Sequence, residues 1–393
     1  MKRISILHRR VSLMKQLAVS CSILEYLILF KSISYYLGVL CHMISEENIV
    51  ISHQDLVKIS EIDQFKGEWE LLSQERKYHI DALKRVTTIE SIGSSNRIEG
   101  NILSDKDVER VLLHINAQSF ASRDEEEVAG YAELMQLIFD EYQVIPFTEN
   151  YIKYLHKVML KHVEKDGYHC GEYKRFPNSV AAFDADGKEI GIVFQAASVF
   201  ETPSLMEELV VWVRKTLEEH AMHPLVTIAV FIVHFLAIHP FQDGNGRLSR
   251  ALTTLLFLQC GYRYVMYSSL ESIIEASKAR YYQALRKTQQ NIWSPDVEYE
   301  SWFSYFFSAL LKQKLHLQEK LSSMPLLDRQ LGQLARSILR LFDQQEQWTI
   351  VTMAEQLQVS SSAVSKSVKS LVDGGYLVKY GVTRGAWYER PLH

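Results

Sequence analysis

The sequence predicts an all-α protein, and three observations support that fold class. The 393 residues include only 8 prolines and 17 glycines, so few residues interrupt helices. Apolar side chains recur at intervals of three and four through most of the chain, which is the period of an amphipathic helix. Residues 224–238 are apolar nearly all round, so we expect them to form the central buried helix.

Composition indicates a soluble globular protein. Hydrophobic residues make up 47% and charged residues 23% of the chain, and the net charge of −4 provides no overall attraction to nucleic acid. The four cysteines lie far apart, which argues against a zinc site or a disulfide framework and fits a reducing cytoplasm. They are Cys21, Cys41, Cys170 and Cys260.

Residues 1–42 differ from the rest, with six lysines or arginines against one acid, Glu25. Their apolar run, residues 17–40, is compatible with a signal anchor or membrane helix. Glu25 and Lys31 interrupt it, and a charge at bilayer depth is costly. We therefore favour a dispensable amphipathic extension, or a start assigned too early with Met43 as the true one, and expect no stable membrane partner.

Residues 43–120 are expected to form an N-terminal helical region, followed by a core domain over residues 121–321. Ser104 is a favourable N-cap for a helix with Asp107 in its first turn. Residues 179–196 break the helical period, because two β-rich runs flank a DADG sequence. That pattern predicts a small hairpin inside the helical core.

The C-terminal unit, residues 328–393, follows a short linker at 322–325. Three helical segments and two short strands around a GVTRG turn resemble a winged helix-turn-helix. The unit is mildly basic, and Lys366 and Lys369 on its third helix could contact DNA phosphates. A protein-interaction or dimerisation module is the alternative, and a homodimer is left open.

The segment HPFQDGNGRLSR, residues 239–250, combines features of a phosphate site. Pro240 disfavours helix at the residue before it, so His239 should stand at a helix-to-loop corner. Gly244 and Gly246 allow close backbone approach, and their amides precede a helix whose N-terminus attracts anions.

Three charged side chains complete this segment. Asp243 supplies a hard oxygen ligand suited to Mg²⁺. Arg247 and Arg250 are three residues apart, so both guanidinium groups should point from one face of the following helix. A base, a metal ligand, amides and two arginines within twelve residues indicate nucleotide chemistry.

This segment is similar to the signature of the Fic family, HxFx(D/E)GNGRxxR, and the resemblance extends roughly over residues 90–310. It implies that His239 is the general base, with a pKa near neutrality, and that Asp243 binds Mg²⁺ on the α- and β-phosphates. The remaining implied nucleotide contacts are Gly244, Asn245 and Gly246 around the phosphates, with Arg247 and Arg250 on the β- and γ-phosphates.

The implied activity is a protein adenylyltransferase that moves AMP from ATP to a Ser, Thr or Tyr hydroxyl of a target protein, which could be itself. Gly246 favours AMP transfer, because relatives that phosphorylate tend to carry lysine there. The alternative is a DNA-binding transcription regulator whose Fic site senses nucleotide or is vestigial. The intact His239 and Asp243 favour the enzyme.

A second motif, SSNRIEGN, resembles the inhibitory motif of this family in Ser95, Glu99 and Gly100. The resemblance implies that Glu99 pairs with Arg250 and takes the place of the γ-phosphate. A capped helix end would explain the same residues without inhibition. In some relatives this glutamate instead positions water to remove AMP.

Two further regions resemble family features. The second strand of the hairpin resembles a flap that aligns a target segment by strand addition, through Ile192, Val193, Phe194 and Gln195. Tyr281 and Tyr282 resemble a pair beside the adenine, although both could equally be core residues.

Overall fold

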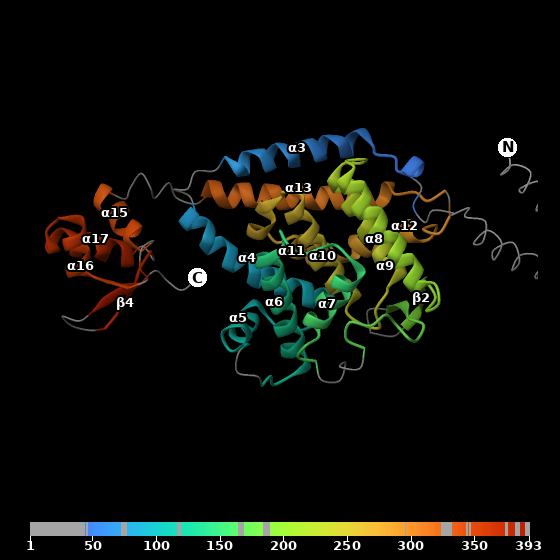
Figure 1. The fold of residues 1–393 in the computed structure, drawn as a ribbon, viewed down its shortest axis with the longest axis horizontal. Coiled ribbons are helices and arrows are strands. Elements are labelled where there is room, and N and C mark those ends of the chain that lie inside the picture. The colour runs from blue at the N-terminus through green and yellow to red at the C-terminus, as the bar shows by residue number, and fades with distance from the viewer. Residues whose placement is uncertain are drawn as a thin grey trace, which may run out of the picture. The chain divides into compact units, whose positions relative to one another are not determined.

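The computed structural model is mostly helical, as predicted (Figure 1). It describes residue 44 and residues 46–389, with gaps at 72–76, 116–118, 164–168, 184–188, 295, 324–331, 343–344, 346, 374–375 and 382–385. Residues 1–42, for which we expected an amphipathic extension, lie outside the described residues. Within the described part, no helix combines the length and apolarity needed to cross a membrane.

The N-terminal region begins with a short 3₁₀ turn and three helices, whose ends follow local capping rules. They are η1 (Glu46–Asn48), α3 (His53–Glu70), α4 (Lys77–Ile98) and α5 (Asp105–Leu113). Ser104 caps α5 as predicted, because its hydroxyl accepts from the Asp107 amide while the Asp107 carboxylate accepts from the Ser104 amide. This capping box fixes where the chain turns after α4.

The core domain is built around α9, which is buried at every residue after Pro224. Its helices are α6 (Arg123–Glu141), α7 (Glu149–Met159), α8 (Thr202–Glu218), α9 (Pro224–Ile238) and α10 (Asn245–Gln259). The indole of Trp302 donates to the Ala229 carbonyl at 2.7 Å, so a side chain that surrounds α9 is also hydrogen-bonded to it. A helix apolar on all sides can be stable in water only when it is surrounded in this way.

The second half of the core surrounds α9 and continues into a long helix. Its elements are η5 (Arg263–Tyr267), α11 (Leu270–Ala276), α12 (Lys278–Gln289) and α13 (Glu300–Ser323). Helices α3 and α13 pack along each other, although they are far apart in sequence (Figure 1). The helix α13 runs to Ser323, two residues beyond the expected end of the core domain.

The predicted hairpin is present as β1 (Ser179–Phe183) paired antiparallel with β2 (Glu189–Gln195). Ser179 lies opposite Gln195 and Val180 opposite Phe194. The turn and the side chains of both strands lie outside what the structure describes, so the flap role of residues 192–195 stays a prediction.

The C-terminal unit contains the three predicted helices and two predicted strands, with one additional strand. They are α15 (Gln333–Leu341), β3 (Gln347–Thr349), α16 (Ile350–Leu357), α17 (Ser361–Asp373), β4 (Val378–Tyr380) and β5 (Trp387–Glu389). The sheet order is β3-β5-β4, all antiparallel. The unit has its own apolar core, which includes Ile338, Met353, Val364, Val368 and Leu371. The winged-helix assignment itself stays a prediction.

Candidate active site

His239 stands at the corner where α9 gives way to a loop, as predicted. It is the C-cap of α9 with φ 51° and ψ 60°, and its amide donates to the Phe235 carbonyl at 2.9 Å. The Nδ1 atom lies 3.3 Å from the Leu236 carbonyl. Since a carbonyl only accepts, Nδ1 carries the proton and Nε2 keeps the lone pair that a base needs.

The pKa of His239 is lower than the near-neutral value expected from the sequence. Burial of the imidazole lowers this pKa to about 4, and the nearby Lys174 acts in the same direction. Glu99 and Asp243 oppose this shift only in part. The ring is therefore neutral at cellular pH, which is the protonation state of a general base.

Two side chains before the hairpin hold the backbone of this corner, and sequence reasoning missed both. Lys174 and Asn178 together donate to the four successive carbonyls of residues 238–241. The Lys174 ammonium donates to the Ile238 carbonyl at 2.9 Å, and the Lys174 backbone amide donates to the Pro240 carbonyl at 2.8 Å. The side-chain amide of Asn178 donates to the carbonyls of His239 at 3.3 Å and Phe241 at 2.8 Å. Burial lowers the pKa of Lys174 to about 8. The sequence did not indicate these hydrogen bonds, because neither Lys174 nor Asn178 belongs to a motif.

The loop after the corner is anchored by Phe241, which is fully buried as expected. Its ring stacks on His156, with centroids 3.9 Å apart and planes at 9°. His156 accepts from the Gly171 amide through Nδ1 at 2.9 Å, so its Nε2 carries the proton and donates to the Asp243 carbonyl at 3.0 Å. Burial lowers the pKa of His156 to about 4, so this neutral tautomer persists in the folded protein.

Asn245 closes the loop with its side chain. Its Oδ1 accepts from the Phe241 amide at 2.9 Å, and its Nδ2 donates to the Phe241 carbonyl at 2.7 Å. Family resemblance placed Asn245 among the groups around the phosphates. In the structure its amide group bonds to Phe241 at both ends, and its contact with phosphates stays a prediction.

The N-terminus of α10 has the properties of an anion site. Gly244 is the N-cap with φ 79°, a conformation that favours glycine, and no side chain caps the helix. A Cβ atom on Gly246 would collide with the carboxylate of Glu99. An anionic group therefore already lies over the helix end, where the dipole and the free amides favour negative charge.

Arg250 contacts two residues of the predicted inhibitory motif. Its Nε donates to the Ser95 hydroxyl at 2.9 Å, and its Nη2 lies 2.8 Å from the Glu99 carboxylate. Burial disfavours the charged form of Arg250, yet Glu99 raises its pKa above the ordinary value. Gly100 has φ 103° and follows the last turn of α4, so it also ends this helix. The motif therefore both ends a helix and contacts Arg250.

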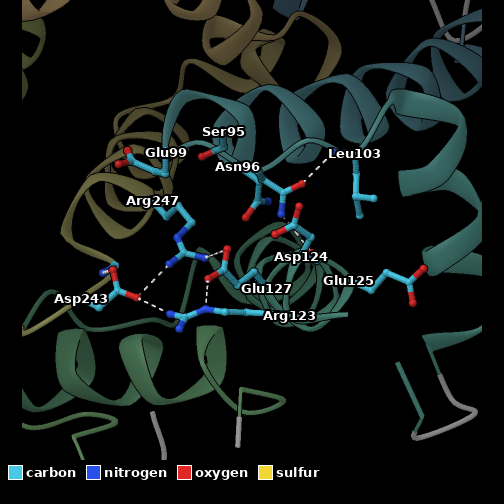
Figure 2. Close-up of polar contacts among 12 residues, drawn as sticks. Ser95, Asn96, Glu99, Leu103, Arg123, Asp124, Glu125, Glu127, Asp243 and Arg247 are labelled. Carbon is cyan, nitrogen blue, oxygen red and sulfur yellow. Dashed lines mark hydrogen bonds and ion pairs between the residues drawn. The ribbon is translucent and has the colours of Figure 1, made fainter. Parts of the chain in front are cut away.

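Arg247 reaches Glu127 on α6 and Asp243 in the loop (Figure 2). Its two terminal nitrogens lie 3.1 Å from Glu127 on α6 and 3.4 Å from Asp243. Its side chain is only 3% exposed, and its Nε has no hydrogen-bond partner within the described part of the chain. The two arginines, three residues apart on α10, thus pair with acids on two different helices, Glu127 on α6 and Glu99 at the end of α4. That both act on a nucleotide from one face of α10 stays a prediction.

Asp243 has the donor chemistry that magnesium prefers. Its side chain is 41% exposed, and one oxygen, Oδ1, accepts from the Gly244 amide at 2.6 Å. The described residues contain no group of three or more His, Cys, Asp or Glu side chains that could cage a metal. One partly exposed carboxylate is a ligand that a magnesium ion can share with substrate phosphates.

Both tyrosines lie beside the site. Tyr281 is buried, with its ring 5.9 Å from that of Trp302, and burial raises the pKa of its phenol while Arg250, beside it, opposes that shift. Tyr282 is partly exposed. Burial and then the charge of Glu99 raise the pKa of Tyr282, so its phenol lies beside the site. The adenine contact of both rings stays a prediction.

Comparison with known proteins gives the same family that the motif resembles. Residues 146–257 match the Fic/DOC family. The chain is 27% identical over 282 residues to Protein adenylyltransferase Fic of Drosophila virilis, covering 67% of this chain and 53% of that protein. It is 28% identical over 220 residues to the Drosophila melanogaster protein of that name, covering 55% and 40%. The chain thus spans about half the length of these relatives or less.

Solved structures resemble the fold. A Fic family protein from Desulfovibrio desulfuricans superimposes with a TM-score of 0.58 at 19% identity, over 88% of this chain and 98% of that one. This likeness concerns the fold alone. A Fic domain-containing signaling protein from Bacteroides thetaiotaomicron gives a TM-score of 0.53 at 26% identity, over 66% of this chain and 95% of that one.

Proposed function

We propose that this chain, which contains a Fic domain over residues 146–257, is a protein adenylyltransferase that uses ATP to modify a hydroxyl of a target protein. The observation that carries the proposal is the neutral His239, whose Nε2 lone pair lies at the corner leading to the N-terminus of α10. A base beside an anion site is the pairing that nucleotidyl transfer to an alcohol requires.

In this proposal the hydroxyl oxygen of a Ser, Thr or Tyr attacks the α-phosphorus of ATP. The new oxygen–phosphorus bond forms as the bond to the β-phosphate oxygen breaks, and pyrophosphate leaves. His239 takes the hydroxyl proton on Nε2. The amides at the start of α10, together with Arg247 and Arg250, would neutralise the phosphate charge. Because the fold already holds these groups in place, little reorganisation would be needed during the reaction.

Asp243 would hold a magnesium ion against the phosphates. When bound, the ion would neutralise phosphate charge and help pyrophosphate to leave. Among the described residues the buried Nε of Arg247 has no hydrogen-bond partner. A buried donor without a partner is unfavourable, which supports an anionic ligand beside it.

We further propose that Glu99 inhibits the enzyme. Its carboxylate pairs with Arg250 and lies over Gly246 at the helix end. A γ-phosphate would need the same arginine and the same space. ATP would therefore bind with its phosphates misaligned until Glu99 moves away.

Incubation with α-labelled ATP and Mg²⁺, followed by detection of label on protein, tests both proposals. Glu99→Gly should raise label transfer strongly over the wild type, and adding His239→Ala to it should abolish transfer. Glu109→Gly on α5 is a matched control, since Glu109 is paired with Arg85 away from the site. No label with any variant would refute the enzyme, whereas equal label in wild type and Glu99→Gly would refute only the inhibition.

The C-terminal unit supports a separate proposal, that it contacts the phosphate backbone of duplex DNA. One face of α17 exposes hydroxyls and ammonium groups, namely those of Ser362, Ser365, Lys366 and Lys369. Such a face suits phosphate contacts. Binding of the full chain to a random duplex should weaken as salt rises, and a Lys366→Gln, Lys369→Gln variant should weaken it further. No binding at low salt would favour the protein-interaction alternative.

A further inference from the structure

Two arginines and two acids form a closed ring beside the loop, and only one of the arginines belongs to the signature segment (Figure 2). Arg123, in the first turn of α6, places Nη2 3.3 Å from Asp243 and Nε 2.9 Å from Glu127. Arg247 closes the ring, with contacts of 3.4 Å to Asp243 and 3.1 Å to Glu127. Charges therefore alternate around the ring, and each acid contacts both arginines.

The ring engages the same carboxylate that is proposed to bind magnesium. Oδ2 of Asp243 faces both guanidinium groups, while Oδ1 accepts from the Gly244 amide. A divalent cation approaching this carboxylate would meet two positive charges at close range, and this repulsion is long-ranged enough to matter even in water. At least one guanidinium must move away before the carboxylate can become a metal ligand.

Arg123 is the group able to move. Its side chain is 50% exposed, whereas that of Arg247 is 3% exposed and is fixed in the core of the site. Glu127 is only 14% exposed and lies one helical turn after Arg123, so it can retain the guanidinium when the contact to Asp243 breaks.

We propose that Arg123 is a positioning residue that occupies the Asp243 carboxylate in the nucleotide-free protein and yields it to the metal ion arriving with the nucleotide. Glu127 restrains both arginines and so limits their hold on Asp243. This inference rests on the proposed function, because it concerns the metal ligand of the same site. It assigns to α6 a role in metal binding that lies outside the signature segment.

Calorimetric titration with ADP, in Mg²⁺ and again in EDTA, tests the inference without any need for catalysis. ADP is chosen because it lacks the γ-phosphate that Glu99 is proposed to exclude. The measured quantity is the factor by which Mg²⁺ tightens ADP binding. The variants are Arg123→Gln, Glu127→Gln and Asp243→Asn, with Arg110→Gln as the control. Arg110→Gln removes one positive charge from the neighbouring helix α5. Arg110 pairs with Asp107 on α5 and with Glu125 on α6.

Arg123→Gln should increase the Mg²⁺ factor about tenfold, because the metal no longer displaces a guanidinium. Glu127→Gln should decrease it, because both arginines then lose the acid that competes with Asp243 for them, and Asp243→Asn should abolish it. Arg110→Gln should match the wild type. A decreased or unchanged factor in Arg123→Gln, an equal increase in Arg110→Gln, or a full factor in Asp243→Asn would overturn the inference. Failure of the proposed enzyme would instead appear as absent label transfer with these binding factors intact.

Discussion

Replacing Asn245 by alanine tests whether this side chain closes the loop or serves the nucleotide. The structure commits both ends of its amide group to Phe241, at 2.9 Å and 2.7 Å. The Phe241 carbonyl would keep its bond from Asn178 at 2.8 Å, whereas the Phe241 amide would be left buried without a partner.

The expected cost follows from these contacts. One lost hydrogen bond contributes about 1 kcal/mol, and an unpaired buried amide costs about 1–3 kcal/mol, so Asn245→Ala should destabilise the protein by about 2–4 kcal/mol. Alanine is a better helix former than asparagine, which would offset a few tenths of a kcal/mol at this first position of α10.

Thermal unfolding of the nucleotide-free protein measures the effect, with Asn291→Ala as the control at an exposed turn. The melting temperature of Asn245→Ala should fall by several degrees, while that of Asn291→Ala should stay at the wild-type value. An unchanged melting temperature together with weakened ADP binding would refute the reasoning, because the side chain would then act on the ligand.

Three further predictions concern the corner and the site. Label transfer by Glu99→Gly should be flat from about pH 6 to about pH 8 and fall only at about pH 4 or below, because the pKa of His239 is about 4 with Glu99 present and removal of that negative charge lowers it further; a fall near the ordinary histidine pKa would contradict the burial argument. Gly246→Ala should lower label transfer even in the Glu99→Gly background, because its Cβ atom enters the space that the γ-phosphate would need; unchanged transfer in that background would show that no phosphate lies over this glycine. Lys174→Met should raise the pKa of His239, because a neighbouring positive charge is lost, so the acid limb of label transfer should move to higher pH; an unmoved limb would show that Lys174 acts only on the backbone.

Much of the helical architecture was predictable because it depends on local pattern. Residues 224–238 are apolar on every side, and they form α9 with the predicted bounds. Ser104 and Asp107 form the predicted cap, since a capping box involves only four consecutive residues. The strand β3 was missed because three residues between helices are too few to show an alternating pattern.

The sequence by itself determined the chemical groups of the site. The spacing from His239 to Arg250 is contained in one loop and fewer than two helical turns, so backbone geometry alone brings the base, the glycines and Asp243 together. The Glu99–Arg250 pair was expected only through family resemblance, because the two residues are far apart in sequence; the structure places them 2.8 Å apart.

Tertiary structure alone decided the state of those groups. Packing lowers the pKa of His239, and Lys174 and Asn178 reach the corner from a segment with no motif. Helix α6 brings Arg123 to Asp243 and Glu127 to Arg247. The burial and the ion pairs of these side chains depend on which helices pack against each other. The sequence of one helix does not indicate which helix packs against it.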